Sequence, residues 1–89
     1  MDAEEIREEI RAIARHPHNV TFADIERVVR NLEPFYAHVK ATKRKHSWLF
    51  EVGDQTFSVS DHNKGRRQVK VSYVDNFIDA MINLRWYED

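Results

Sequence analysis

Hydrophobic residues recur along this chain with two different periods, and the change of period marks a change of secondary structure. Apolar side chains repeat at helical spacing over residues 2–15 and again over residues 22–32. From residue 36 to residue 60 apolar and polar residues alternate, which is typical of strands. A last helical repeat runs over residues 74–82. The pattern therefore predicts the order α-α-β-β-β-α.

The predicted helices carry start and stop signals. Three capping patterns, each with an acceptor side chain and an acid three residues later, are Asp2 with Glu5, Thr21 with Asp24, and Ser72 with Asp75. Prolines end the first two helices at Pro17 and Pro34. Two pairs at i,i+3 spacing are expected on the solvent face of the first helix: Glu4 with Arg7 and Glu8 with Arg11. The apolar stripe of this helix is narrow, so we expect it to pack loosely or against another chain.

Three strands are expected between the helices, over residues 36–41, 46–52 and 55–60. Gly53 and Asp54 supply a two-residue hairpin turn of the kind with glycine first. Residues 42–45 form a basic loop between the first two strands, and residues 61–68 form a polar connection to the last helix.

These elements predict one α+β domain over residues 1–89, a two-layer sandwich in which helices cover one face of a three-stranded antiparallel sheet. Residues 1–16 are an additional N-terminal helix, and residues 19–85 are the core of the domain. Trp86 and Tyr87 are expected to pack on this core or to contact a second copy in a homodimer.

Composition narrows the function classes. The chain has no cysteine, which excludes disulfides, thiolate zinc sites and a thiol nucleophile. No apolar run is long enough to span a membrane, and the acidic start MDAEEIREE does not resemble a signal peptide, so we expect a soluble, cytoplasmic protein without a membrane partner. The five histidines show no metal-ligand spacing, and the two glycines cannot build a phosphate loop, so we expect neither a metal nor a cofactor.

Charge is segregated along the chain although the net charge is only -1. Acids outnumber bases eight to five in residues 1–33 and four to one in residues 71–89, whereas bases outnumber acids eight to three in residues 34–70. A basic middle between acidic helices is the pattern expected when one surface meets a polyanion such as RNA. The candidate phosphate-binding residues are Lys43, Arg44, Lys45, Lys64, Arg66, Arg67 and Lys70.

His46 is the candidate catalytic residue because it directly follows three of these cations. Neighbouring cations lower the pKa of a histidine, and a bound phosphodiester raises it again, so the ring can exchange protons near neutral pH. RNA cleavage without a metal needs such a group together with cations that stabilise the phosphorane. The alternative is that His46 is only a strand residue beside a phosphate-binding loop.

Strict alternation would put His46 on the same face as Trp48 and Phe50, which are candidates for burial. Three arrangements would still expose the ring. His46 could stand at the wet start of the strand, a bulge could turn it outward, or the two aromatic residues could themselves stack on bases at an open face.

Residues 19–82 resemble the HicA-type mRNA interferase toxins, small proteins with a fold like that of double-stranded-RNA-binding domains. The stretch NVTFADIERVVRNLEPF resembles the first helix of that family, KRKHSWLF resembles the strand start that carries its histidine, and SDHNKGRRQVKVSYVDNFI resembles its third strand, basic loop and final helix. The resemblance implies that His46 is catalytic, that the protein is an endoribonuclease toxin of a toxin–antitoxin pair, and that a HicB-like antitoxin protein is its partner.

This chain departs from the family at two places. Arg44 and Lys45 replace the usual Gly-Ser before the histidine, and Leu49 stands where an aromatic is expected. A shifted alignment puts Ser47 at the histidine position and predicts a protein that binds RNA without cleaving it. The alternative function is therefore a non-catalytic RNA-binding or protein-interaction module. A further alternative is a structural dimer joined through the first helix and Trp86.

Overall fold

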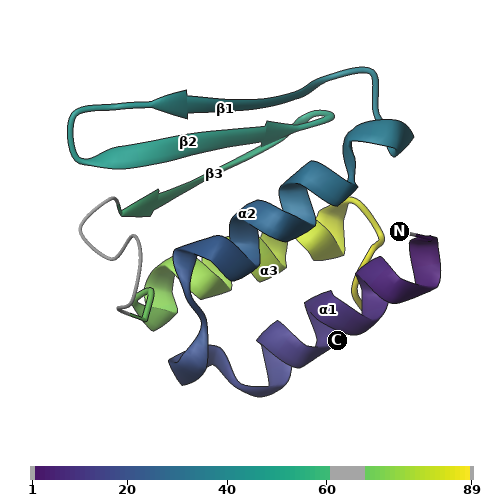
Figure 1. Ribbon diagram of the computed structural model, residues 1–89, viewed down its shortest axis with the longest axis horizontal. Helices are drawn as coiled ribbons and strands as arrows, with labels where there is room; N and C mark the ends of the chain where they lie inside the picture. The colour runs from purple at the N-terminus through teal and green to yellow at the C-terminus, as the bar shows by residue number, and fades with distance from the viewer. Residues whose placement is uncertain (1, 61–67, 89) are drawn as a thin grey trace.

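The computed structural model describes residues 2–60 and 68–88 and shows three α-helices and three strands within them (Figure 1). In chain order the elements are α1 (Ala3–Arg15), the 3-10 turn η1 (Pro17–Asn19), α2 (Phe22–Asn31), the 3-10 turn η2 (Glu33–Phe35), β1 (Val39–Lys43), β2 (Ser47–Val52), β3 (Gln55–Ser60) and α3 (Val71–Asn83). The predicted α+β class and element order are confirmed.

The strands form one antiparallel sheet in the order β1-β2-β3. Val52 of β2 pairs with Gln55 of β3, so Gly53 and Asp54 alone make the turn between them, as predicted. Gly53 has a φ of 59°, and Asp54 is not among the residues with positive φ, which is the pattern of a turn with glycine first. An added Cβ at Gly53 would lie 3.2 Å from the ring of Tyr36, so the position is restricted by packing as well as by conformation.

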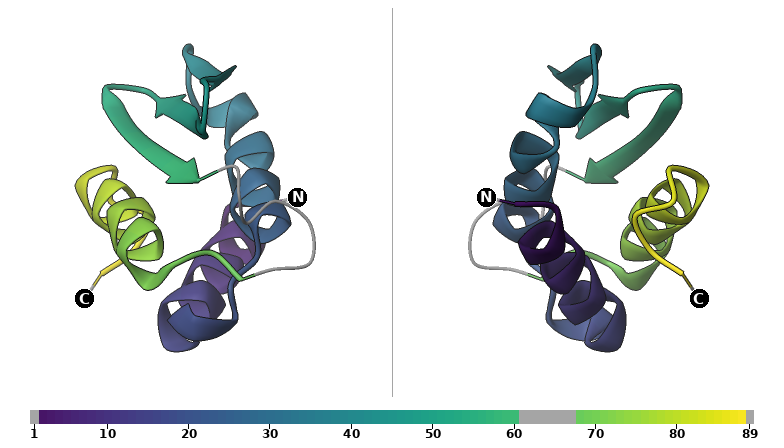
Figure 2. Two further views of the ribbon diagram at one scale, coloured as in Figure 1. Left: turned by 90° about the vertical axis from the view of Figure 1, so that its left-hand side faces the viewer. Right: turned by 90° about the vertical axis from the view of Figure 1, so that its right-hand side faces the viewer.

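The inner face of the sheet packs on α2 and α3, which lie on the same side of it (Figure 2). Aromatic rings connect the two layers. Phe22 of α2 lies 5.8 Å from Phe50 of β2, Phe50 stacks on Phe57 of β3 at 5.3 Å, and Phe57 meets Phe77 of α3 edge to face at 5.4 Å. All four side chains are at most 5% exposed, so this row of rings is the centre of the core.

The helices cover β2 and β3, but of β1 only the start, at Val39, packs against the core. Cross-strand pairing puts Ala41 and Lys43 of β1 on the inner face, opposite Phe50 and Trp48. Both β1 residues are nevertheless exposed, whereas Phe50 is buried. β1 is therefore an edge strand, and its end that leads into the basic turn extends beyond the helical layer.

α1 belongs to the core, and the expectation that it packs loosely or against another chain is wrong. Figure 1 shows α1 on the side of α2 and α3 that faces away from the sheet. Ile6 and Ile10 are fully buried there and Ile13 is 7% exposed. The narrow stripe is sufficient because α1 needs to bury only the seam between two other helices.

The segment that follows α3 packs against the N-terminal half of α1. The indole of Trp86 donates a hydrogen bond to the Tyr36 hydroxyl at 2.6 Å, and its ring meets Phe35 edge to face at 5.1 Å. Arg7 stacks over the same indole at 4.8 Å and donates to the Arg85 carbonyl at 3.0 Å. Trp86 is therefore a packing residue, and the side chains suggested for a structural dimer are buried within the monomer.

Two of the three predicted caps are confirmed, with reciprocal hydrogen bonds between Asp2 and Glu5 and between Thr21 and Asp24. The third is wrong, because α3 begins at Val71 after the N-cap Lys70 rather than after Ser72. The amide of Val69 donates to the Val20 carbonyl at 2.7 Å, and this contact turns the chain into the helix before Ser72 is reached.

One of the two ion pairs predicted on the solvent face of α1 is confirmed, and the other is wrong. Arg11 binds Glu8 at 2.6 Å as predicted, but it also binds Glu4 at 2.6 Å, because Arg7 turns toward the C-terminal segment. The hydrogen bonds that Arg11 donates to Glu8 and Glu4 raise the pKa of its guanidinium. Of the helices that the structure describes, none combines the length and apolar character required to cross a bilayer.

Truncating Ile10 to alanine tests whether α1 is part of the core. The side chain is fully buried, so we expect the substitution to lower the free energy of unfolding by roughly 2–5 kcal/mol, measured by urea denaturation. Arg15→Ala, at an exposed position of the same helix, is the control and should change it by less than about 0.5 kcal/mol. Equal effects of the two substitutions would mean that α1 does not contribute to the core.

Candidate nucleic-acid interface

The basic turn between β1 and β2 is tighter than predicted. The first strand begins at Val39 instead of residue 36, because its partner β2 ends at Val52, which pairs with Val39, and it continues through Lys43. The Arg44 amide donates to the Ser47 carbonyl at 2.7 Å, so Lys45 and His46 form the tip of the turn. The predicted loop 42–45 is thus shifted toward the C-terminus, and His46 lies in the turn rather than in a strand.

His46 lies at the exposed start of β2, which is the first of the three arrangements that would expose the ring. The residue is exposed and precedes Ser47, where the strand begins. Every residue of β2 pairs with a successive residue of β3, so β2 has no bulge. Phe50 is 1% exposed and therefore cannot stack on bases, while the half-buried Trp48 lies 6.1 Å from the ring of Phe22.

The ammonium group of Lys43 contacts the backbone of the turn. It donates to the carbonyl of Arg44 at 2.7 Å and lies 3.5 Å from the carbonyl of Lys45. Two backbone oxygens of the turn therefore contact one cation, and this restrains the conformation of the tip. Lys43, Arg44 and Lys45 are all exposed, but the ammonium of Lys43 is engaged with these carbonyls, so Arg44 and Lys45 are the better candidates for contacts with phosphate.

Lys70 lies at the same end of the molecule as the turn. Figure 1 shows the start of α3, the C-terminal end of β3 and the turn between β1 and β2 at one end. Lys70 is exposed at the N-cap of α3, where the positive end of the helix dipole adds to its charge. The candidate residues Lys64, Arg66 and Arg67 lie outside the described residues.

A short backbone pairing that the sequence analysis missed positions Lys70. Thr21 forms an isolated antiparallel bridge with Gln68, next to the hydrogen bond between Val69 and Val20. This pairing fixes the segment before α3 to the start of α2. Val20 and Val69 lie next to this bridge. Both are β-branched residues that favour extended backbone, so the sequence contained an indication of this pairing.

Glu51, the acidic residue of β2, lies away from the basic turn. Residues 43–50 contain no aspartate or glutamate, and Glu51 pairs with His38 at 3.3 Å near the other end of β1. The basic turn therefore presents positive charge without a carboxylate of its own segment to neutralise it. Within residues 2–60 and 68–88, no group of three or more histidine, aspartate or glutamate side chains is placed to hold a metal ion.

Comparisons with protein-family models, with curated proteins and with solved structures gave no match for this chain.

Replacing Lys43 by glutamine tests its role in the turn. The shorter neutral side chain cannot reach both carbonyls, so we expect the Arg44 amide, which bonds to Ser47, to exchange its hydrogen several-fold faster in NMR experiments. Lys40→Gln removes the same charge from an exposed position of the same strand and should leave that rate unchanged. A similar acceleration in both variants would show that charge, not the support of the turn, sets the rate.

Proposed function

We propose that this protein is a metal-independent endoribonuclease that binds RNA through its basic end, defined here as the turn Lys43–His46 together with Lys70. The observation that carries the proposal is the position of His46, an exposed imidazole at the tip of a hairpin beside Arg44 and Lys45. A sugar-phosphate chain that contacts these two cations has access to the ring. Arginine suits bidentate contacts with phosphate, and lysine acts as a point charge.

The chemistry would be internal phosphoryl transfer within the RNA. His46 removes the proton of a 2′-hydroxyl, the 2′-oxygen attacks the adjacent phosphorus, and the bond to the 5′-oxygen breaks to leave a 2′,3′-cyclic phosphate. The leaving oxygen takes a proton from the Lys45 ammonium or from water. Arg44 and Lys45 stabilise the additional negative charge of the phosphorane, and Lys43 keeps the turn in shape.

The biological role we propose is that of an mRNA interferase toxin in the cytoplasm, held inactive by a HicB-like antitoxin. Its support is the resemblance of residues 19–82 to HicA-type toxins, together with an α-β-β-β-α order after α1 that agrees with that fold. The observation that would add most is whether a neighbouring reading frame encodes a small antitoxin-like protein.

A second candidate function is RNA binding without cleavage. One observation favours it: the His46 ring lies at an exposed tip rather than in an enclosed site. An enclosed site strengthens the electrostatic stabilisation of a transition state. The same cations would serve either function.

Cleavage of RNA by the purified protein in EDTA distinguishes the two candidates. We expect mixed mRNA to be cut, and His46→Ala to slow the reaction by about a hundredfold or more, because general acid–base catalysis is lost. His38→Ala replaces another exposed histidine, which directly precedes β1, and should retain the rate. Intact RNA together with retained binding would reject the nuclease and favour the binding module.

The salt dependence of binding tests the surface itself. Because each neutralised phosphate of single-stranded RNA releases about 0.7 counterion, the double variant Arg44→Gln, Lys45→Gln should reduce the slope of log K against log salt by about 1.4. The control, Arg30→Gln with Lys40→Gln, removes the same charge from exposed positions outside the turn and should reduce it less. A slope near zero for the unmodified protein would exclude both candidate functions.

A further inference from the structure

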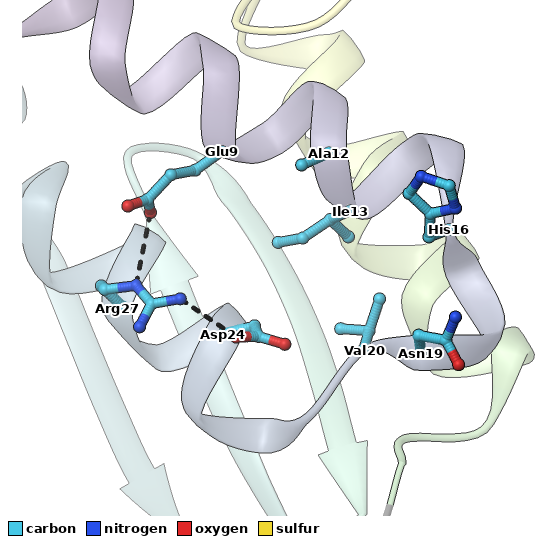
Figure 3. Close-up of a pocket in the computed structure, with 8 residues that line it drawn as sticks. All are labelled: Glu9, Ala12, Ile13, His16, Asn19, Val20, Asp24 and Arg27. Atoms are coloured by element: carbon cyan, nitrogen blue, oxygen red, sulfur yellow. Dashed lines mark hydrogen bonds and ion pairs between the residues drawn. The ribbon is translucent and has the colours of Figure 1, made fainter.

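A groove between α1 and α2 takes no part in the proposed RNA chemistry. It encloses about 450 Å³ and is lined by side chains from α1, η1 and α2 (Figure 3). Small-molecule sites in proteins typically have volumes of about 300–1,000 Å³, so the groove is large enough for a small ligand.

The groove has a polar end, an apolar floor and a second polar end. In Figure 3 Glu9 and Arg27 lie at one end, and Asn19 lies at the other beside His16. Between them Ile13 and Val20 form the floor and are 7% and 2% exposed. A ligand that lies along the groove would therefore need an apolar middle and a polar group at each end.

Glu9 has acceptor capacity that the protein leaves unused. Its Oε2 atom is buried and has no hydrogen bond, although the Arg27 Nε atom lies 3.5 Å away. Asp24 differs, because one of its oxygens accepts from Arg27 at 3.0 Å and the other from the Thr21 amide at 2.9 Å. The Glu9 side chain as a whole lines the groove and is 27% exposed, so a charged donor in the groove can approach this carboxylate group.

The charge at this end favours a cation. Two carboxylates, Glu9 and Asp24, face the single guanidinium of Arg27. An ammonium or guanidinium group combines the required donor with the required charge.

The length of the groove favours a small molecule over a helical peptide. From Glu9 to His16 the groove follows seven residues of α1, a rise of about 10 Å. A docked helix would need anchors spread over at least two turns and a groove open at both ends. Here η1 closes one end and the ion pair of Arg27 with Glu9 crosses the other.

We propose that this groove binds a small organic cation, with an ammonium or guanidinium group at Glu9, a short aliphatic chain over Ile13 and Val20, and a polar group near Asn19. The proposal is independent of RNA binding, because the groove residues are separate from the basic end. It adds a ligand site to the helical side of the domain.

The probe that tests it is 6-aminohexanamide, with hexanamide as its neutral analogue, in an NMR titration of backbone amide signals. We expect saturable shifts confined to the amides that line the groove, and at least tenfold weaker binding of hexanamide. Glu9→Gln should weaken binding of the probe at least about tenfold, the size expected for one charge-assisted hydrogen bond. Glu8→Gln makes the same change on the solvent face of α1 and should leave binding unchanged.

A second variant keeps the test decisive if Glu9→Gln alters the fold. Ala12 is exposed in a helix and lines the groove, so Ala12→Leu should fill the space, preserve the helix and abolish the shifts. The proposal is wrong if the unmodified protein shows no saturable shifts, or if Ala12→Leu or Glu9→Gln binds the probe equally well. It is also wrong if sedimentation shows self-association that Glu9→Gln abolishes, since the occupant would then be a second copy.

Discussion

The burial of the inner face of the sheet against α2 and α3 is the interaction on which the rest of the structure depends. The row of rings from Phe22 through Phe50 and Phe57 to Phe77 fixes which face of β2 and of β3 is inside. A shift of one residue in the register of either strand would move Phe50 or Phe57 to solvent, so the register is strongly determined. The position of the basic turn follows, because a fixed register leaves few residues between β1 and β2.

The sequence predicted the elements that local chemistry controls. The caps at Asp2 and Thr21, the hairpin at Gly53 and the α+β order were all correct, since each depends on a short-range pattern. The start of α3 and the role of Arg7 were wrong because both depend on partners far away in the chain. The hydrogen bond from the Val69 amide to the Val20 carbonyl precedes a helix that begins before Ser72. The guanidinium of Arg7 stacks on Trp86.

For the candidate site, too, the sequence predicted only what depends on adjacent residues. The clustering of Lys43, Arg44, Lys45 and His46 was evident because the residues are adjacent, and the structure confirms that His46 is exposed. The contacts of Lys43 with the carbonyls of the turn could not be inferred, since they depend on the tight shape of the tip. The groove between α1 and α2 was also not predicted, because the apolar stripe of a helix predicts that its residues are buried but not which spaces remain between two packed helices.

The contact between Arg7 and Arg85 joins positions 78 residues apart. Contacts of such separation raise the contact order and slow folding, since most of the chain must be ordered before they form. In chain order α1 precedes both α2 and α3, the helices that cover its isoleucines. Full burial of these isoleucines is therefore possible only after α3 has been translated, and until then they are open to solvent or to chaperones.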